Sequence, residues 1–187
     1  MFKRIFDLFL SGFMFFIFSG FLLLIALLVK LTSNGSIFYW SQRIGKGNTV
    51  FLMPKFRTMR TDTPVVATHL LANPDAYLTP VGKFLRTTSL DELPQLYSIL
   101  VGHMSFVGPR PALFNQDDLI DLRTRAGVHV LTPGLTGWAQ VNGRDELPIP
   151  DKVELDKVYL QKQSWLFDLQ ILLRTFVKVV RRDGVVH

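Results

Sequence analysis

The apolar residues of this chain are concentrated near its N-terminus. From Leu8 to Val29 no side chain is charged, and the stretch is rich in Phe, Leu and Ile. A helix of this length reaches about 30 Å, which is enough to cross the hydrocarbon core of a bilayer. The pattern therefore predicts a membrane anchor over residues 1–34. A second domain, over residues 35–187, follows it with the mixture of charged and apolar residues that is typical of a globular fold.

The flanks of the anchor indicate which way it faces. Lys3 and Arg4 precede the apolar stretch, and Lys30, Arg43 and Lys46 follow it. Basic residues favour the cytoplasmic side of a membrane, so this rule draws both ends of the anchor to that side. A straight spanning helix cannot satisfy both ends, whereas a helix that enters the membrane, bends and returns can.

Ser19-Gly20, in the middle of the stretch, is the candidate bend. Gly/Ser pairs kink helices, and a serine hydroxyl can bond a carbonyl that the kink frees. We therefore expect a re-entrant anchor. A single spanning helix stays open as an alternative, as does a cleaved signal peptide, although Asp7 just before the apolar stretch disfavours the latter.

Beyond the anchor the pattern changes to short elements. Runs at 37–40 and 49–53 are β-like and flank a glycine-rich turn at 43–48, which predicts a hairpin. The fold class we expect is α+β and mostly helical, with this small hairpin and amphipathic helices at the membrane interface. The remaining expectations are an irregular loop over 61–80, two helices that flank Asp91, a helix near 114–126, a loop region over 132–151, and a final helix from Lys152 or Ser164 towards Arg182.

The last predicted helix is amphipathic and basic. Its apolar positions, at helical spacing, are Leu166, Leu169, Leu173, Phe176, Val177 and Val180, and its basic side carries Arg174, Lys178, Arg181 and Arg182. Such a helix can lie in a membrane interface. It can equally be a surface helix that packs its apolar face on its own core. The pattern alone leaves both interpretations open.

Charge and composition narrow the class of partner. The formal net charge of +6 favours an anionic partner, such as an anionic lipid surface or a phosphorylated substrate. No run of basic residues and no recognition motif accompanies this charge, so no nucleic-acid partner is predicted. The absence of cysteine excludes disulfides and thiolate chemistry, and the four histidines do not have the spacing of metal ligands.

The adjacent carboxylates Asp91 and Glu92 are the strongest chemical candidates. Where a loop enters a helix, such a pair can bind a metal, attack as a nucleophile or transfer a proton. Mg²⁺ prefers a few carboxylates together with phosphate oxygens. The alternative is structural, because Ser89 and Glu92 have the spacing of a capping box. Pro94 complicates that alternative, since it fits the first turn of the helix only if Asp91 is the cap.

Several basic residues stand in constrained surroundings. Lys55 and Arg57 follow a β-like run, Arg110 lies between two prolines, and Arg144 follows the turn dipeptide Asn142-Gly143. An arginine held on rigid backbone is suited to phosphate binding, because less entropy is lost when the ligand binds.

Taken together, these segments resemble the bacterial sugar transferase family, the monotopic phosphoglycosyl transferases. The resemblance extends over nearly the whole chain. The matching blocks are Lys3–Asp7, Lys55–Met59, Ser89–Leu96, Met104–Pro111, Pro133–Arg144 and Asp156-x-x-Tyr159.

The resemblance implies an activity and a set of roles. Family members transfer a sugar-1-phosphate from a UDP-sugar to undecaprenyl phosphate and release UMP, through a covalent phosphosugar–enzyme intermediate. It implies that Asp91 is the nucleophile, that Glu92 is its partner and that both bind Mg²⁺. It also implies a bacterial inner-membrane enzyme whose catalytic domain is on the cytoplasmic face. The residues it implies around the substrate are Lys55, Arg57, Arg110, Arg144 and Asp156, with Lys55 and Arg110 on phosphate and Arg144 at the nucleotide end.

One departure from the family and two rival functions qualify this resemblance. Family anchors commonly break at a Ser-Pro pair, whereas Ser19-Gly20 stands here. A non-enzymatic membrane scaffold would explain the anchor but not the acidic pair. A one-step transferase would use the same residues, with Asp91 as a base or metal ligand. The sequence identifies neither the sugar nor the oligomeric state, and a homodimer is among the states it allows.

Overall fold

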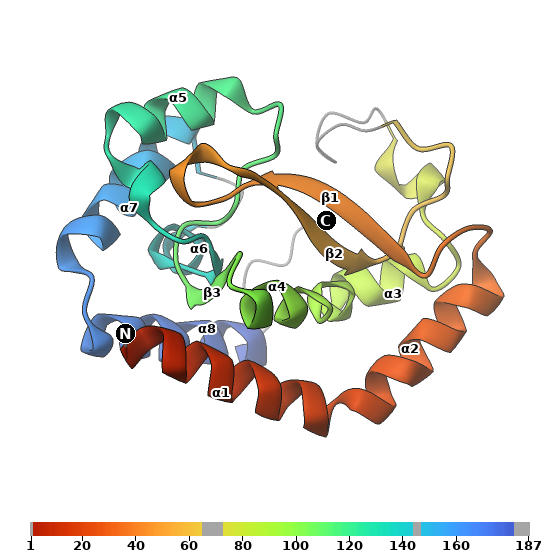
Figure 1. The fold of residues 1–187 in the computed structure, drawn as a ribbon. Coiled ribbons are helices and arrows are strands. Elements are labelled where there is room, and N and C mark those ends of the chain that lie inside the picture. The colour runs from red at the N-terminus through yellow and green to blue at the C-terminus, as the bar shows by residue number, and fades with distance from the viewer. Residues whose placement is uncertain (1, 65–72, 144–146, 182–187) are drawn as a thin grey trace.

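The structure, a computed structural model, describes residues 2–64, 73–143 and 147–181, and a bent pair of helices underlies the rest of the fold (Figure 1). The helices are α1 Phe2–Ile17, α2 Ser19–Thr32, α3 Gly82–Thr87, α4 Gln95–Val101, α5 Asp117–Arg125, α6 Trp138–Asn142, α7 Ile149–Lys162 and α8 Trp165–Arg181. The strands are β1 Phe38–Ile44, β2 Val50–Phe56, β3 Ser105–Val107 and β4 Gly134–Thr136. The predicted α+β class, mostly helical with a small hairpin, is confirmed.

The apolar N-terminal segment forms two helices instead of one. α1 ends at Ile17, α2 begins at Ser19, and the two axes are bent by 64° at the break. The Ser19 hydroxyl donates a hydrogen bond of 2.8 Å to the carbonyl of Phe16, which partners a carbonyl next to the break. A bend at this position is what Ser19-Gly20 predicts. No single described helix is long and apolar enough to cross a bilayer, whereas α1 and α2 together meet that test of length and composition.

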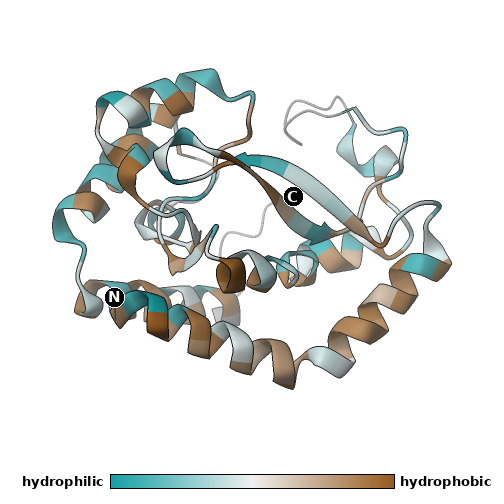
Figure 2. Cartoon of the chain, in the orientation of Figure 1, coloured by the Kyte–Doolittle hydropathy of each residue, from teal (hydrophilic) through white to brown (hydrophobic). Residues whose placement is uncertain are grey.

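Both helices of the pair use one face to pack on the rest of the chain. The residues on these inward faces are Phe6, Leu10 and Met14 of α1 and Leu22, Ile25 and Val29 of α2. Their other faces remain exposed and apolar, as the brown ribbon of α1 and α2 shows (Figure 2). The anchor and the domain therefore share core contacts, and the boundary between residues 34 and 35 stays a prediction.

The first turn of α1 is tied to the domain by its two basic residues. Lys3 Nζ donates to the carbonyl of Val107 at 2.9 Å, to the hydroxyl of Tyr159 at 3.0 Å and to Oδ2 of Asp168 at 2.6 Å. The guanidinium of Arg4 donates to two carbonyls in the last turn of α4, where backbone acceptors lack helical partners. Since α2 leads directly into β1, both ends of the helix pair are attached to the same domain.

The predicted hairpin is present and longer than expected. β1 and β2 are antiparallel, with Tyr39 opposite Lys55 and Ser41 opposite Met53. Arg43 and Ile44, which we had expected in the turn, belong to β1. Phe51 and Met53 of the hairpin enter the main core, where they meet residues of α4, β3, α7 and α8.

The segment 132–151 is not a loop region, so that prediction is wrong. It contains β4, α6 and the first residues of α7, and β4 pairs in parallel with β3. Each of these strands has three residues, which is too short for a periodic signal. Gly134 lies so close to the backbone of Gly108 that a Cβ on it would collide with Gly108, so the contact requires glycine at this position.

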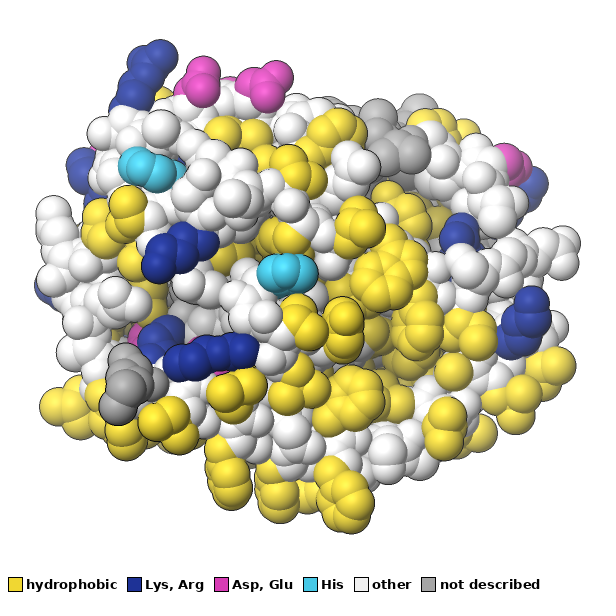
Figure 3. All heavy atoms as spheres, in the orientation of Figure 1, with side chains coloured by type: hydrophobic (Ala, Val, Ile, Leu, Met, Phe, Trp, Pro, Cys, Tyr) yellow, Lys and Arg dark blue, Asp and Glu magenta, His cyan; other side chains and the backbone are white. Residues whose placement is uncertain are grey.

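The predicted final helix is two helices, α7 and α8, and each of the two expected starting points corresponds to one of them. The apolar side of α8 faces outward: Leu166, Leu173 and Phe176 are 76%, 67% and 68% exposed. The helix buries Asp168 and Ile171 instead. The interpretation of α8 as a surface helix that packs this apolar face on its own core is therefore wrong. Apolar side chains also gather along the lower edge of the molecule in Figure 3, on the side of α1 and α2.

Candidate active site

The acidic pair lies on a single 3₁₀ turn, Leu90–Glu92, between α3 and α4. Ser89 is in the left-handed region with φ of 56° and makes no capping hydrogen bond through its side chain. Pro94 occupies the N-cap position of α4, and the helix begins at Gln95. The capping interpretation of this segment is therefore wrong, and the side chain of Glu92 is directed to other partners.

Glu92 is held by two cations from distant parts of the chain. Its Oε1 accepts hydrogen bonds from Lys55 Nζ at 2.7 Å and from Arg110 Nη2 at 3.2 Å. Burial alone would raise the pKa of Glu92, but the positive charges of Lys55 and Arg110 outweigh it and hold the pKa well below its usual range. Glu92 is therefore an anion whose orientation is fixed by the protein.

The surroundings of Asp91 differ from those of Glu92. It is only 8% exposed, and it forms no ion pair within the described ranges. The pKa of Asp91 is raised to about 6, because burial and the negative charge of Glu92 together outweigh the lowering effect of the positive charges of Lys55 and Arg86. This carboxylate is therefore desolvated and, near neutral pH, ionised without an ion-pair partner among the described residues. These are properties of a reacting group.

The donor set fits a magnesium ion shared with a substrate. Proteins commonly hold Mg²⁺ with one or two carboxylates together with phosphate oxygens of the substrate. Asp91 makes no ion pair with a described residue, and Glu92 keeps one oxygen outside its two ion pairs. In the part of the chain that the structure describes, no cluster of three or more His, Cys, Asp or Glu residues forms a dedicated metal cage.

Arg110 and Lys55, both predicted at the site, are brought together by the fold. Lys55 comes from β2 and Arg110 from the turn after β3, and both meet at Glu92 although they are 37 and 18 residues away from it in sequence. The side chain of Arg110 is 37% exposed, so part of its guanidinium can still meet a ligand.

Asp156 is buried and paired with Arg123, a residue that the sequence analysis did not identify. Its side chain is 1% exposed, and its Oδ2 accepts from Nε and Nη2 of Arg123 at 2.9 and 2.7 Å. Burial raises the pKa of Asp156, while the charge of Arg123 lowers it. Direct contact of Asp156 with a substrate stays a prediction. Nothing in the charged pattern of α5 distinguishes Arg123 from its neighbours.

The structure gives a position for only one of the two remaining predicted residues, Arg57 and Arg144. Arg57 donates to the carbonyl and hydroxyl oxygens of Ser36, at 2.9 and 2.8 Å, and so ties β2 to the segment that follows the anchor. Arg144 lies outside the described residues. A ligand role for either one stays a prediction.

Comparisons with known proteins bear on this site. A family model described as "Bacterial sugar transferase" matches residues 1–182. The chain is 39% identical over 199 residues to the exopolysaccharide production protein ExoY of Rhizobium meliloti (strain 1021), a match that covers 97% of this chain and 87% of that protein.

Two longer proteins with more specific names are also similar. The UDP-glucose:undecaprenyl-phosphate glucose-1-phosphate transferase of Escherichia coli (strain K12) is 39% identical, over 94% of this chain and 39% of that protein. The undecaprenyl-phosphate galactose phosphotransferase of Salmonella typhimurium is 37% identical, over 97% of this chain and 41% of that protein. The match to each of these covers less than half of the relative and nearly all of the present chain.

Proposed function

The chain belongs to the bacterial sugar transferase family and is a phosphoglycosyl transferase, and we propose that it transfers a sugar-1-phosphate from a UDP-sugar to undecaprenyl phosphate. The names of the relatives support these two substrates. The observation that carries the proposal is the division of charge at the acidic pair. Glu92 is committed to two cations, whereas Asp91 is a desolvated carboxylate without an ion pair among the described residues.

The first step is an attack by Asp91. A carboxylate oxygen of Asp91 forms a bond to the phosphorus that carries the sugar, the bond from this phosphorus to the oxygen of the neighbouring phosphate breaks, and UMP leaves with that oxygen. The product is an aspartyl phosphosugar. Removal from water makes the Asp91 carboxylate a better nucleophile than one that is solvated or ion-paired.

The second step regenerates the enzyme. A phosphate oxygen of undecaprenyl phosphate attacks the same phosphorus, and the Asp91 carboxylate departs. The products are undecaprenyl diphosphate sugar and the free enzyme. Since each step exchanges one phosphorus–oxygen bond for another, the reaction needs no redox partner, and the lipid phosphate is the second nucleophile.

The neighbouring cations lower the barrier in both steps. An anionic carboxylate approaches an anionic phosphate only where positive charge offsets their repulsion. Lys55 and Arg110 supply two such charges while they keep Glu92 oriented. A magnesium ion held by Asp91, Glu92 and the diphosphate would supply further charge on the leaving phosphate.

The membrane would be met by the outward faces of α1, α2 and α8. Their exposed apolar side chains include Phe9, Phe16, Leu23, Leu31 and Phe176. A soluble protein rarely leaves so large a contiguous apolar surface in water. Since both ends of the α1–α2 pair are attached to one domain, we propose a re-entrant anchor over residues 1–34, with the catalytic domain at the cytoplasmic face of the inner membrane.

Release of UMP from a panel of UDP-sugars tests this function. The full-length chain in detergent or nanodiscs is incubated with undecaprenyl phosphate and magnesium, beside Asp91→Ala as the control. We expect release with one donor class in the wild type and none in the variant. Release that persists in Asp91→Ala, or none from any donor, contradicts the proposal.

A further inference from the structure

The segment that carries Arg110 is held in place through its carbonyl groups. Pro109 and Pro111 have no N–H, so this turn cannot be fixed by the usual backbone donors. Instead, four consecutive carbonyls each accept a hydrogen bond from another element. The pairs are Pro109 with Gly134 N at 2.9 Å, Arg110 with Arg123 Nη1 at 2.8 Å, Pro111 with Arg43 Nη1 at 3.2 Å and Ala112 with Ile44 N at 3.0 Å.

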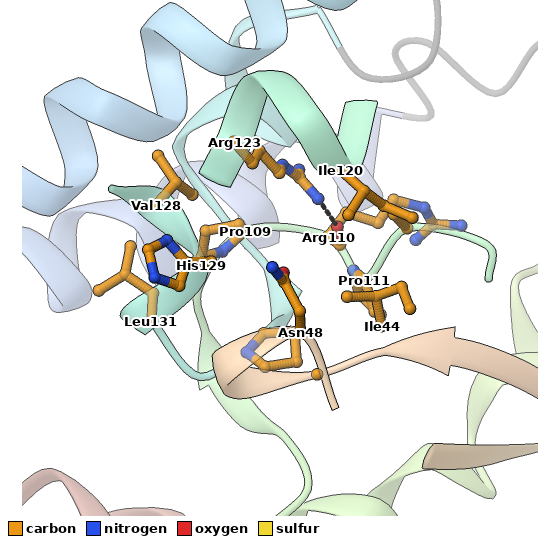
Figure 4. A pocket seen from close by; sticks show the side chains of 13 residues that line it. Ile44, Asn48, Pro109, Arg110, Pro111, Ile120, Arg123, Val128, His129 and Leu131 are labelled. Atoms are coloured by element: carbon orange, nitrogen blue, oxygen red, sulfur yellow. Dashed lines mark hydrogen bonds between the residues drawn. The ribbon is translucent and has the colours of Figure 1, made fainter. Parts of the chain in front are cut away.

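Arg123 donates the hydrogen bond to the carbonyl of Arg110, and its own position is fixed by Asp156. Nε and Nη2 donate to Oδ2 of Asp156. Nη1 donates to the carbonyl of Arg110 (Figure 4). The side chains of Arg123 and Asp156 are 12% and 1% exposed. A guanidinium held by a buried carboxylate on two of its nitrogens presents the third in a defined direction.

The proline rings limit the backbone of the turn, so the single hydrogen bond from Arg123 can fix the conformation at Arg110. They fix φ at Pro109 and Pro111, and a residue before proline has restricted backbone angles. The main freedom left at Arg110 is therefore rotation about its own φ, and about its ψ within the range allowed before proline. The bond from Arg123 to the carbonyl of Arg110 removes that rotation, and the Arg110 side chain then starts from a defined backbone and reaches Glu92.

The guanidinium of Arg123 is largely enclosed by the protein: the side chain is 12% exposed, and Nε, Nη1 and Nη2 donate to Asp156 or to the carbonyl of Arg110. It lines a cavity of about 30 Å³ together with Ile44, Asn48, Pro109 and His129 (Figure 4). A cavity of this size holds one or two water molecules, and neither a nucleoside nor a sugar phosphate fits in it. Since the hydrogen bonds of Arg123 go to Asp156 and to the carbonyl of Arg110, we expect it to act on the reaction through Arg110.

We propose that Arg123 is a positioning residue of the active site, which orients Arg110 towards Glu92 and is itself oriented by the buried Asp156. The inference rests on the proposed function, in which Arg110 faces the phosphate of the substrate. It also assigns Asp156 a place in the site, as the counter-ion of Arg123 beneath the substrate-facing residues.

A double-mutant cycle separates positioning from a general loss of structure. The kcat of UMP release is measured for Arg110→Ala, Arg123→Met and the double variant, with Arg125→Met, an exposed arginine on the same helix, as the matched control. A small displacement of a group at the reacting centre costs up to about 100-fold in rate, so we expect Arg123→Met to lower kcat by about 10- to 100-fold. In the Arg110→Ala background it should lower kcat no further. Losses that multiply in the double variant would overturn the inference.

Two more variants keep the test valid if Arg123→Met folds poorly. Arg123→Lys keeps a charge opposite Asp156 but lacks the guanidinium fork that serves two acceptors, so it should restore thermal stability without restoring kcat. The paired substitution Arg123→Leu with Asp156→Leu removes both buried charges, which proteins often tolerate, and should also fold with low kcat. Wild-type kcat in either of these stable variants contradicts the positioning role.

Failure of the proposed function has a different signature. A wild type that releases no UMP from any donor contradicts that function, and the inference is then decided by amide hydrogen exchange at Arg110, Ala112 and Leu113. Exchange there should be faster in Arg123→Lys than in the wild type and unchanged in Arg125→Met. Equal exchange in wild type and Arg123→Lys would overturn the positioning role.

Discussion

Lys55 Nζ lies 2.7 Å from Oε1 of Glu92, and no such partner is present in the described part of the chain for Asp91, the residue beside it. The pKa values of the two adjacent carboxyl groups are therefore shifted in opposite directions. Charge compensation pushes the pKa of Glu92 down, and burial raises that of Asp91 to about 6. Where the protein environment shifts the pKa values of two neighbouring carboxyl groups in opposite directions, the two groups have different roles in catalysis. In the proposed mechanism Glu92 orients the cations and Asp91 reacts.

Asp91→Asn should stabilise the protein while it abolishes transfer. The pKa of Asp91 is about 6 in the folded protein and its ordinary value is 3.8, so the folded protein binds the proton more tightly, and the ionised carboxylate costs stability above about pH 6. The amide avoids this cost, and we expect a gain of roughly 1–3 kcal/mol at neutral pH. The gain should shrink as the pH falls from about 6 to 4, where the wild type becomes protonated.

Denaturant unfolding of the full chain in detergent with a chelator, at a series of pH values, measures this difference. A variant that is less stable than the wild type at neutral pH, or a gain that does not change with pH, contradicts the assignment of a desolvated and ionised Asp91.

Lys55→Met should slow transfer without removing the fold. The substitution keeps the length of the side chain but removes one of the two charges that face Glu92, so the pKa of Glu92 rises and the phosphate loses a compensating cation. Loss of one such group typically lowers kcat by about 100- to 1,000-fold. The matched control is Lys83→Met, because Lys83 is 74% exposed and its ion pair within the described residues is with the exposed Asp75 at 3.5 Å. Equal activity of the two variants would exclude Lys55 from the site.

Lys3→Met should loosen the attachment of α1. Lys3 pairs with Asp168, whose side chain is 6% exposed, and it also donates to Tyr159. Removing one partner of a buried pair leaves the other carboxylate uncompensated, and we expect a loss of about 3 kcal/mol. Lys30→Met, at the exposed end of α2, is the control and should change the thermal midpoint little. Matching midpoints for the two variants would show that the contacts of Lys3 do not secure the helix.

The re-entrant anchor is open to cysteine labelling, since the chain contains no cysteine. Phe2→Cys and Lys46→Cys lie at the two ends of the helix pair, and Phe16→Cys lies near its bend with 82% of the native side chain exposed. In inverted vesicles, where the cytoplasmic face is outside, the two end positions should react with an impermeant maleimide and the bend position should not. Labelling of the two ends from opposite sides of the membrane would establish a spanning arrangement.

Some of the fold followed directly from the sequence. The long uncharged stretch located the helix pair, Ser19-Gly20 located its bend, and β-like runs around a glycine turn located the hairpin. The strands β3 and β4 were missed because three residues carry no periodicity, and they pair only when the backbones of Gly108 and Gly134 approach each other. The outward apolar face of α8 was beyond prediction because an amphipathic pattern does not say which side is buried.

Part of the candidate site could also be predicted from the sequence, and part could not. The adjacent carboxylates and the cations of the long motif blocks could be selected from the sequence, and the fold brings Lys55, Arg110 and Glu92 together. The spacing of Ser89 and Glu92 suggested a capping box, which is absent because Ser89 has a left-handed backbone conformation and makes no capping hydrogen bond through its side chain. Arg123 gave no signal, because its role depends on a carbonyl 13 residues away and a carboxylate 33 residues away.

The covalent role of Asp91 is tested most directly by transfer of label to the protein. The full-length enzyme is incubated with magnesium and a UDP-sugar that carries a radioactive β-phosphate, in the absence of lipid acceptor. We predict that label becomes attached to the wild type with release of UMP, that added undecaprenyl phosphate removes it, and that Asp91→Asn acquires none. Transfer to lipid at the full rate by an enzyme that never becomes labelled, or labelling of Asp91→Asn, would contradict the account and favour direct transfer in one step.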